Sequence, residues 1–461
     1  MTTKCRTFVD IFSQHSEVTG SSILLIVKLS NGDIVKGMID CGMFQEMEYQ
    51  NENIKFLIEP KQLDFLCLTH DHIDHMGRIP LLVNMGYKKK IYCTNDTSVL
   101  LPYTLHDNFK IMKERCKRKN QKLWYSIEDV TNSEKLIVKK QYYETFNVHP
   151  KIKITFLENG HLLGAAMILL QIEDEENINL LFTGDYNNKN LFFDINPIPQ
   201  WIKDLPITII SESTYGDRTT KESLSEMEKT FSQNIIEAVS EKKDILIPAF
   251  ALGRSQEVLY YLKEIQFQKN MDDYKIYLDG SLAIAYTELL RVGMVESIKY
   301  EMQDFLPRNF SYVVSGKMRE DIINSRGRKI IVTTSGMAQY GPAQFYIPIF
   351  IPRQNAIIHF TGYCAEGTYG RKIKDESEYY ENIKFTTEFS AHAKKDVLLN
   401  LIKEFNNVKA ILINHGDKDV KNKFKSYLEE ETSIKYIRVL EKKMGFRVNA
   451  YGIMKEWNTI F

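Results

Sequence analysis

The stretch LDFLCLTHDHIDH spans Leu63–His75 and joins an apolar run of strand length to a cluster of histidines and aspartates. Similar apolar runs occur on both sides of it between Ile23 and Thr183, with few helical patterns between them. Several short strands arranged in this way are typical of stacked sheets. The predicted strands cover residues 23–29, 34–40, 63–69, 151–158, 165–172 and 179–183.

The cluster after this strand has the residue types and the spacing of a metal site. The side chains of His70, His72 and Asp74 are two residues apart, so they project to the same side of an extended loop. His75 turns away from them where a helix begins near Gly77, so two groups of ligands can face two neighbouring metals. Imidazole and carboxylate together suit zinc with an open position for water. The alternative interpretation is a polar loop whose side chains satisfy one another.

The pattern changes from about Ser223 onwards, where strands alternate with helices. This alternation is typical of a parallel sheet in an α/β domain. A last strand at 410–415 has helices before and after it, and periodicity alone does not decide whether it ends this domain or returns to the first. The expected strands are 245–250, 276–280, 329–336 and 356–363, and the expected helices are 254–266 and 282–292.

Composition sets the class of protein. The 461 residues suffice for about three domains or two large α/β units, and 43% hydrophobic with 26% charged residues excludes a disordered or fibrous chain. Lys plus Arg and Asp plus Glu are both 60, so no global positive field draws the chain to nucleic acid, and a polyanion site must be local. The most basic run is Lys113–Lys122, in a helical pattern just before Trp124 and Tyr125. A solvated helix face and a nucleic-acid contact both remain open for it.

The cysteines and the N-terminal sequence indicate the compartment. The six cysteines are scattered without a CxxC pair, which favours reduced thiols over a disulfide framework. The start of the chain lacks an apolar segment of signal-peptide length, and no window approaches the 18 apolar residues that cross a bilayer. We therefore expect residence in the cytoplasm and no contact with a membrane.

The histidine cluster resembles the HxHxDH motif of the metallo-β-lactamase superfamily, and three more positions follow that family's pattern. Asp40 in MIDCG, His161 in ENGHLLGA and Asp185 in LFTGDY match its first, third and fourth motifs. The resemblance implies an α/β fold, the αββα sandwich of that superfamily. It also implies that Asp40 orients a ligand histidine. Each of these residues alone would more often be a satisfied strand-end group, but their order and positions favour the metal site.

The rest of the chain resembles the β-CASP nucleases, and within them the branch of the nuclease subunit of cleavage and polyadenylation specificity factor with its short prokaryotic relatives. The resemblance implies a β-CASP domain inserted into the lactamase domain. The expected domains are 1–215, the inserted 216–375 and the returning 376–461. The motifs that carry the resemblance are IISESTYGDR (209–218), PAFALGRSQE (248–257), TSGM (334–337), FTGYCAEGTYGR (360–371), EFSAHAKK (388–395) and INHGDK (413–418).

Carried over residue by residue, the family pattern implies a centre of two zinc ions. Asp185 would bridge them, Glu212 would orient His392, and His392 would protonate the leaving oxygen. Glu212 as a satisfied strand-end carboxylate and His392 as a residue packed beneath the next helix are the alternatives. One ion would be held by His70, His72 and His161, and the other by Asp74, His75 and His415.

Substrate contacts are less clear than the metal ligands. Arg254, Ser335 and Gly336 offer donors and Gly turns suited to phosphate, and phosphate contact and fold geometry remain equally open for them. The chain also departs from many relatives at Asp279–Ala283 and Tyr340–Pro342, both in the inserted domain.

The resemblance implies a ribonuclease that hydrolyses RNA phosphodiesters with a metal-activated water and leaves 5′-phosphate and 3′-hydroxyl ends. We expect single-stranded RNA as substrate and endonucleolytic processing or decay as the role. Cleavage from a 5′ end, a homodimer and a processing-complex partner remain open. A DNA nuclease of the cross-link repair branch is the first alternative, but that branch has valine where this chain has His415. A catalytically silent RNA-processing subunit and a non-nuclease hydrolase such as a thioesterase are the others.

Overall fold

The chain folds into two compact units, one formed by residues 1–219 with 391–461 and the other by residues 220–390. In the sequence motifs, residues 388–391 of EFSAHAKK and residues 363, 365 and 366 of FTGYCAEGTYGR lie outside the described residues. The computed structural model describes residues 7–15, 17–220, 224–299, 302, 304–362, 364, 367–386, 392–442 and 444–458.

The first sheet of the first unit has eight strands in the order β21-β20-β1-β2-β3-β4-β5-β6. Its members from β21 to β3 are antiparallel, and those from β3 to β6 are parallel. The strands are β1 (Phe8–Ser13), β2 (Ile23–Lys28), β3 (Ile34–Ile39), β4 (Phe65–Cys67), β5 (Ile91–Thr94), β6 (Ile137–Lys140), β20 (Met444–Asn449) and β21 (Gly452–Asn458).

The second sheet of this unit has seven strands in the order β19-β18-β11-β10-β9-β8-β7. Its central strands, β9 to β11, read as near-continuous apolar runs because they are covered on both faces. The strands are β7 (Thr145–His149), β8 (Ile152–Glu158), β9 (Ala166–Ile172), β10 (Ile178–Phe182), β11 (Ile207–Ser211), β18 (Val408–Ile413) and β19 (Ile437–Val439).

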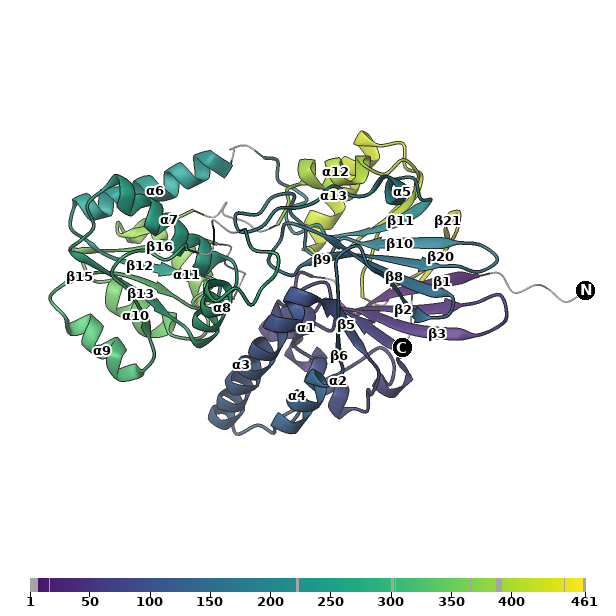
Figure 1. Ribbon diagram of the computed structural model, residues 1–461, viewed down its shortest axis with the longest axis horizontal. Coiled ribbons are helices and arrows are strands. Elements are labelled where there is room, and N and C mark those ends of the chain that lie inside the picture. Colours follow the sequence, from purple (N-terminus) through teal and green to yellow (C-terminus); the bar gives the residue numbers. More distant parts are fainter. Residues whose placement is uncertain are drawn as a thin grey trace, which may run out of the picture. The chain divides into compact units, whose positions relative to one another are not determined.

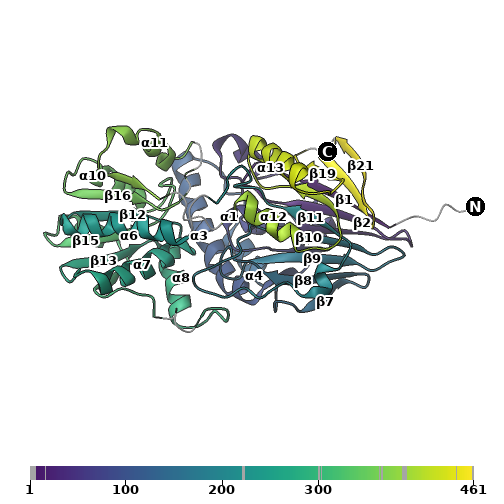
Figure 2. The same ribbon diagram turned by 90° about the horizontal axis from the view of Figure 1, so that it is seen from above.

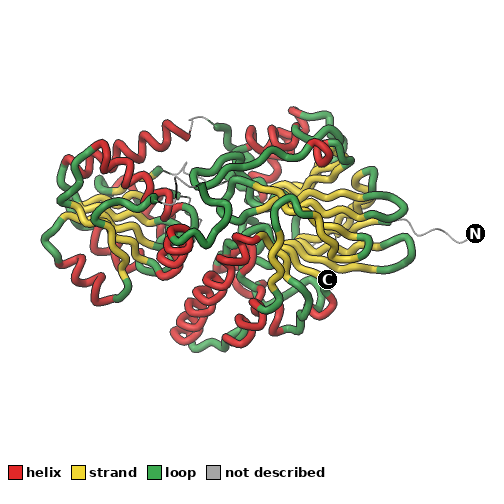
Figure 3. Tube along the Cα trace, viewed as in Figure 1, coloured by secondary structure: helices red, strands yellow, loops and turns green. Residues whose placement is uncertain are grey.

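Helices cover the outer faces of both sheets (Figures 1 and 3). Between the sheets, Val9 and Leu25 of the first pack in one core with Phe156 and Leu170 of the second. One outer core holds helices α1–α4, and the other holds α5, α12 and α13. The expected αββα sandwich is thus confirmed. The helices are α1 (Ile73–Met76), α2 (Ile79–Asn84), α3 (Asn95–Lys119), α4 (Ile127–Glu134), α5 (Gln200–Lys203), α12 (Lys395–Lys403) and α13 (Lys418–Glu431), with 3-10 turns at Met47–Glu52 and Pro60–Gln62.

The C-terminal segment completes both sheets of the sandwich. β18 lies between β11 and β19 and pairs with β11 in parallel, with Ile209 opposite Ile411. β20 pairs with β1 at the start of the chain, with Ile11 opposite Phe446. The strand expected at 410–415 therefore returns to the first unit, next to the strands that carry the metal-site motifs. In Figure 2, the helices α12 and α13 of this segment lie over β10 and β11 of the second sheet.

The second unit is built on a parallel sheet of six strands in the order β14-β13-β15-β12-β16-β17. β17 joins this sheet through β16, although the sequence placed its residues in the returning part; three residues with one lysine give no strand pattern of their own. The strands are β12 (Asp244–Pro248), β13 (Tyr274–Asp279), β14 (Phe310–Val313), β15 (Arg328–Thr333), β16 (Ala356–Phe360) and β17 (Ile383–Phe385). The helices are α6 (Leu224–Ser240), α7 (Arg254–Gln268), α8 (Ser281–Arg291), α9 (Gly316–Asn324), α10 (Ala343–Phe350) and α11 (Tyr369–Asp375), with a 3-10 turn at Ser377–Tyr379.

A helix that crosses a bilayer must be both long and apolar. Within the described parts of the chain, no helix combines 18 or more residues with enough apolar character to cross a membrane. Even α3, with 25 residues, carries seven lysines, arginines and acidic residues over its last ten positions.

Candidate metal centre

The predicted site residues meet at one edge of the sandwich, where several strands end. Asp40 follows β3, His70 comes three residues after the end of β4, and Asp185 comes three residues after the end of β10. His161 lies in the connection between β8 and β9, and His415 follows β18. All five side chains are buried. The apolar strands thus deliver polar side chains to one place at their ends, which is where α/β proteins form their sites.

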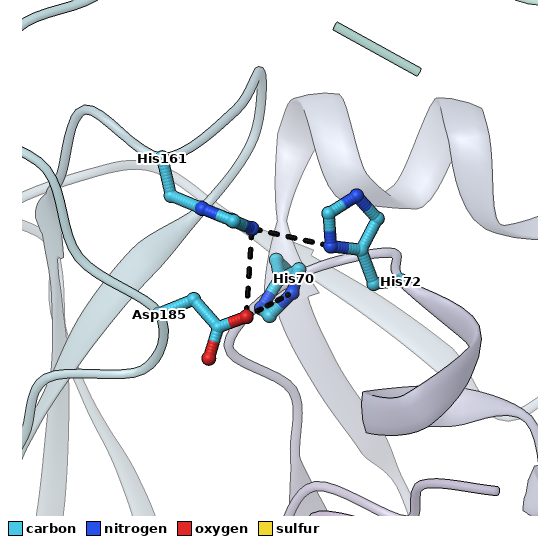
Figure 4. A group of neighbouring side chains, drawn as sticks. All are labelled: His70, His72, His161 and Asp185. Carbon is cyan, nitrogen blue, oxygen red and sulfur yellow. Dashed lines mark hydrogen bonds and ion pairs between the residues drawn. The ribbon is translucent and has the colours of Figure 1, made fainter. Parts of the chain in front are cut away.

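The first group consists of His70, His72, His161 and Asp185 (Figure 4). Nε2 of His161 lies 3.1 Å from Nδ1 of His72, and Oδ2 of Asp185 lies 3.5 Å from Nε2 of His70 and 3.6 Å from Nε2 of His161. A tetrahedral site with ligand distances of about 2.0 to 2.1 Å has edges of about 3.3 to 3.4 Å between its ligand atoms. The spacing of these four groups therefore fits one metal ion.

The second group consists of Asp74, His75 and His415, and it faces the other oxygen of Asp185. Oδ1 of Asp185 lies 3.3 Å from Nε2 of His75 and 3.2 Å from Nε2 of His415. Nε2 of His75 lies 3.9 Å from Oδ2 of Asp74. The two oxygens of one buried carboxylate thus each face a separate set of nitrogen donors, as a carboxylate that bridges two ions would.

The backbone around these ligands differs from the expectation. The helix α1 begins at Ile73, with His72 before its first turn, and not near Gly77. Asp74 therefore lies on the helix with His75 and groups with it, whereas only His70 and His72 lie on the extended segment. Tertiary bonds hold this early turn: the amide of Met43 donates to the carbonyl of Ile73 (3.0 Å).

Asp40 and Thr69 fix the orientation of two ligand histidines. Oδ2 of Asp40 lies 2.8 Å from Nδ1 of His75 and accepts from the hydroxyl of Thr69 (2.8 Å). Because the single hydroxyl proton of Thr69 goes to Asp40, its oxygen can only accept from Nδ1 of His70, 3.0 Å away. Both histidines then carry a proton on Nδ1 and turn Nε2 toward Asp185. Sequence reasoning missed Thr69, although its place between the strand and His70 was a usable signal.

Glu212 and His392 form a pair beside the two groups. Nδ1 of His392 lies 3.0 Å from Oε2 of Glu212, and Nε2 lies 3.8 Å from Oδ2 of Asp185. The other oxygen of Glu212 accepts a short hydrogen bond from the amide of Tyr186, which fixes the carboxylate. Burial opposes protonation of His392, but the charges of Glu212 and Asp185 outweigh it and raise its pKa to about 9.

The protonation of the other histidines fits metal ligation. Burial lowers the pKa of His72 and of His415 to about 3, and it holds the pKa of His70 well below the usual value. Neutral imidazoles of this kind are the form that binds a metal. For His75 burial acts the same way, but the charges of Asp185 and Asp40 outweigh it and raise its pKa well above 6.5. A cation next to Nε2 of His75 would take the place of that proton.

Unsatisfied atoms provide an independent test of whether a metal fits. Buried polar atoms are almost always hydrogen bonded in folded proteins. Within the described ranges, Nε2 of His70, His75 and His415 and Oδ1 of Asp185 have no hydrogen-bond partner. All four atoms point into the same cluster, so the residues present fit a metal centre.

Two of these residues have a left-handed backbone. Asp40 has φ of 60° and His415 has φ of 47°. Residues other than glycine rarely adopt this conformation, and such outliers gather at functional sites where the surrounding structure holds them in place. The bonds of Asp40 to Thr69 and the amide of Ser213 donating to the carbonyl of His415 (3.0 Å) hold the two positions.

The residues predicted to contact phosphate lie in the second unit. Arg254 begins α7 after β12, and Ser335 and Gly336 follow β15, the parallel neighbour of β12. They therefore share one edge of the six-stranded sheet. Arg254 is buried and pairs with Glu257 (2.5 Å), and Gly336 packs against the backbone of Phe250.

Three family models match successive parts of the chain. The metallo-beta-lactamase superfamily domain matches residues 28–192, the Beta-Casp domain matches 255–373, and the Zn-dependent metallo-hydrolase RNA specificity domain matches 381–439. The first match contains every candidate ligand except His415, which lies in the third. Nothing in these matches assigns a role to a single residue.

Curated relatives match most of the chain. An RNase J-like protein of Methanocaldococcus jannaschii is 29% identical over 83% of this chain and 87% of its own length. Ribonuclease TTHA0252 of Thermus thermophilus is 29% identical over 88% of this chain and 93% of its own. An Integrator complex subunit 11 homolog of Dictyostelium discoideum is 30% identical over 86% of this chain. The chain spans only 55% of that relative's length.

Proposed function

Because this chain belongs to the β-CASP branch of the metallo-β-lactamase superfamily, we propose that it is a zinc-dependent ribonuclease that hydrolyses phosphodiester bonds. The observation that supports the proposal most directly is Asp185, whose two buried oxygens face two separate sets of imidazole nitrogens. His392 stands beside it with Glu212 behind. Two ions, a bridging carboxylate and a protonated histidine can together activate a water, stabilise the phosphoryl charge and protonate the leaving oxygen.

In the proposed mechanism, His70, His72 and His161 hold one zinc ion, and Asp74, His75 and His415 hold the other, with Asp185 between them. When bound, two such ions supply a water of lowered pKa and stabilise negative charge on the phosphoryl oxygens. Asp40 and Thr69 act through the ligands by keeping the Nδ1 protons of His75 and His70 in place.

His392 is proposed as the general acid. Its Nδ1–H donates to Glu212, and the surrounding negative charge keeps a second proton on Nε2 at neutral pH. Nε2 is directed toward the metal groups, 3.8 Å from Asp185, so its proton is available to the departing 3′ oxygen. The products would then carry a 5′-phosphate and a 3′-hydroxyl. Arg254, Ser335 and Gly336 are proposed to contact phosphate groups of the substrate.

Single-stranded RNA is the proposed substrate, since two relatives carry ribonuclease names and the third matched model is named for RNA specificity. The histidine at position 415, where the DNA cross-link repair branch has valine, supports the same choice. We also propose that the protein resides in the cytoplasm and acts with a second copy or with a processing-complex partner. The name of the Integrator complex subunit 11 homolog supports the processing-complex partner.

The test is to incubate zinc-loaded protein with linear RNA, circular RNA and single-stranded DNA of the same sequence. Cleavage of the circle would establish endonuclease activity, and end-group analysis should find 5′-phosphates. The protein with Asp185→Ala is the control for contaminating nucleases. Cleavage of DNA as fast as RNA would make the chain a DNA nuclease, and cleavage by metal-free protein would reject the mechanism.

A further inference from the structure

Helix α3 carries a row of exposed side chains that the proposed mechanism does not use. Tyr103, His106, Lys110, Lys113 and Lys117 are three or four residues apart, so they lie along one side of the helix. We call these five residues the α3 row. All of them are exposed. The opposite side of the helix is buried, with Leu101, Leu105, Met112 and Cys116 in the outer core of the first unit.

The row concentrates positive charge in a chain that has none overall. Residues 103–122 contain seven lysines or arginines and two acidic residues, whereas the whole chain has equal numbers of both. Lys110, Lys113 and Lys117 have no ion-pair partner among the residues that the structure describes. His106, in contrast, pairs with Glu134 (2.8 Å). The three lysines therefore present uncompensated charge to the solvent.

The first half of α3 is fastened to the segments that carry the metal ligands. The hydroxyl of Thr104 donates to Oδ2 of Asp71 (2.5 Å), the residue between His70 and His72. Thr94, before the helix, and Thr97, in its first turn, both donate to the carbonyl of Gly164, three residues after His161 (2.7 and 2.8 Å).

The row therefore begins beside the metal centre and leads away from it. Tyr103 is next to Thr104, which is hydrogen bonded to Asp71. Lys117 lies 14 residues further along the helix, a distance of about 21 Å at the rise of an α-helix. Figure 1 shows α3 running out from the sheets with α4 beside it. A substrate strand that is bound at the metal centre and continues along this helix would contact the row.

We propose that the α3 row is a docking surface for the sugar–phosphate backbone of single-stranded RNA. The proposal rests on the proposed function and names a path for the strand beyond the scissile bond. Consecutive lysines stand about 5 Å apart along the helix, and their flexible stems allow each ammonium group to reach a separate phosphate. Tyr103, with 43% of its surface exposed, offers a ring on which a base can stack.

The test compares two triple variants of the full-length protein. One carries Lys110→Gln, Lys113→Gln and Lys117→Gln. The matched control carries Lys88→Gln, Lys89→Gln and Lys90→Gln, three exposed lysines before β5, at the end of that strand opposite to α3. Binding of a labelled RNA of about 20 nucleotides is measured by fluorescence anisotropy between 50 and 200 mM salt. Each lost phosphate contact lowers the slope of log affinity against log salt by about 0.7, so the α3 variant should lose about 2 from the slope and the control none.

Three outcomes distinguish the docking surface from the proposed ribonuclease activity. Equal slopes for the α3 variant and the wild-type protein would overturn the docking surface, as would an equal loss in the control. Circular dichroism and the unfolding temperature verify that both variants are folded, which we expect because substitutions of exposed side chains usually change stability little. Cleavage is measured in parallel. A reduced slope in a protein that never cleaves RNA would support the surface and reject the proposed ribonuclease.

Discussion

The two ligand groups of the metal centre differ in how the chain supplies them. His70, His72 and His161 come from segments between β4 and β9, around strands that pair with their neighbours in sequence. Asp74 and His75 need His415, which lies beyond the whole second unit in sequence and arrives only because β18 pairs with β11. The first group is thus local to the sandwich, whereas the second requires the chain to return after the second unit.

This difference indicates which group depends on the completed fold. Loop-closure entropy grows only slowly with the number of intervening residues, so the long insertion itself costs little. The register of β18 is the critical feature, because a slip of one residue would turn the side chains after it to the other face. The second group is therefore the part of the centre that we expect to be lost first when the C-terminal segment is disturbed.

The largest effect is expected where both groups share a residue. Asp185→Ala removes the carboxylate that faces both, so elemental analysis should find that metal content falls from about two ions per chain toward none. Hydrolysis should fall by more than the factor of about 10²–10⁴ typical of a lost general acid. Loss of only one ion would show that the groups do not depend on a common bridge.

His392→Ala should leave both groups intact and still slow hydrolysis on the order of 10²- to 10⁴-fold, because the leaving oxygen loses its proton donor. The acid form of His392 exists below its pKa, so the wild-type rate should fall as the pH rises through that pKa. The midpoint of this fall should lie at or below about 9, because bound cations offset the charge of Asp185. A substrate with sulfur in place of the bridging 3′ oxygen needs little protonation to depart. It should restore much of the rate to His392→Ala and little to Asp185→Ala. Equal failure of both variants on the sulfur substrate would leave His392 a positioning residue.

His415→Ala and His72→Ala directly compare the two groups. Each removes one ligand from one group, and we expect affinity for a single ion to fall at least 10- to 100-fold while the other ion stays. Removing the C-terminal hairpin β20–β21 should mimic His415→Ala more closely than His72→Ala, because that hairpin holds the returning segment against β1. Chelator titrations followed by metal analysis measure both. A truncation that weakens both ions equally would contradict the distinction between a local and a returning group.

The sequence predicted many of the apolar strands of both units and the residues that gather at their ends, because burial and alternation are local signals. It missed the short buried strands β5 and β11, and also β1, β20 and β21. The pairing of β1 with β20 and of β20 with β21 joins the two ends of the chain, which no local pattern indicates, and β21 is largely polar or half-buried. It also missed the early start of α1, since the turn at Ile73 is held by residues near Met43. The place of His415 came from family resemblance, because no local pattern near Asn414 points to partners that lie before the second unit in sequence.

The smallest expected effect tests whether the two groups are also tuned separately. Thr69→Val keeps the shape of the side chain but removes the oxygen that accepts from Nδ1 of His70, whereas the bond between Asp40 and His75 is retained. Loss of such a supporting bond typically lowers metal affinity about 10-fold, up to 100-fold. The effect can be assigned to one group by combining Thr69→Val with each of two other variants. In the His415→Ala protein, where only the first group is complete, the loss of metal affinity should appear in full. In the His72→Ala protein, the loss should be small. Thr69→Ser, which keeps the hydroxyl, is the control and should bind metal as the wild-type protein does. Equal losses in both backgrounds would mean that Thr69 supports the centre as a whole through Asp40, and that the histidine tautomers of the two groups are not set independently.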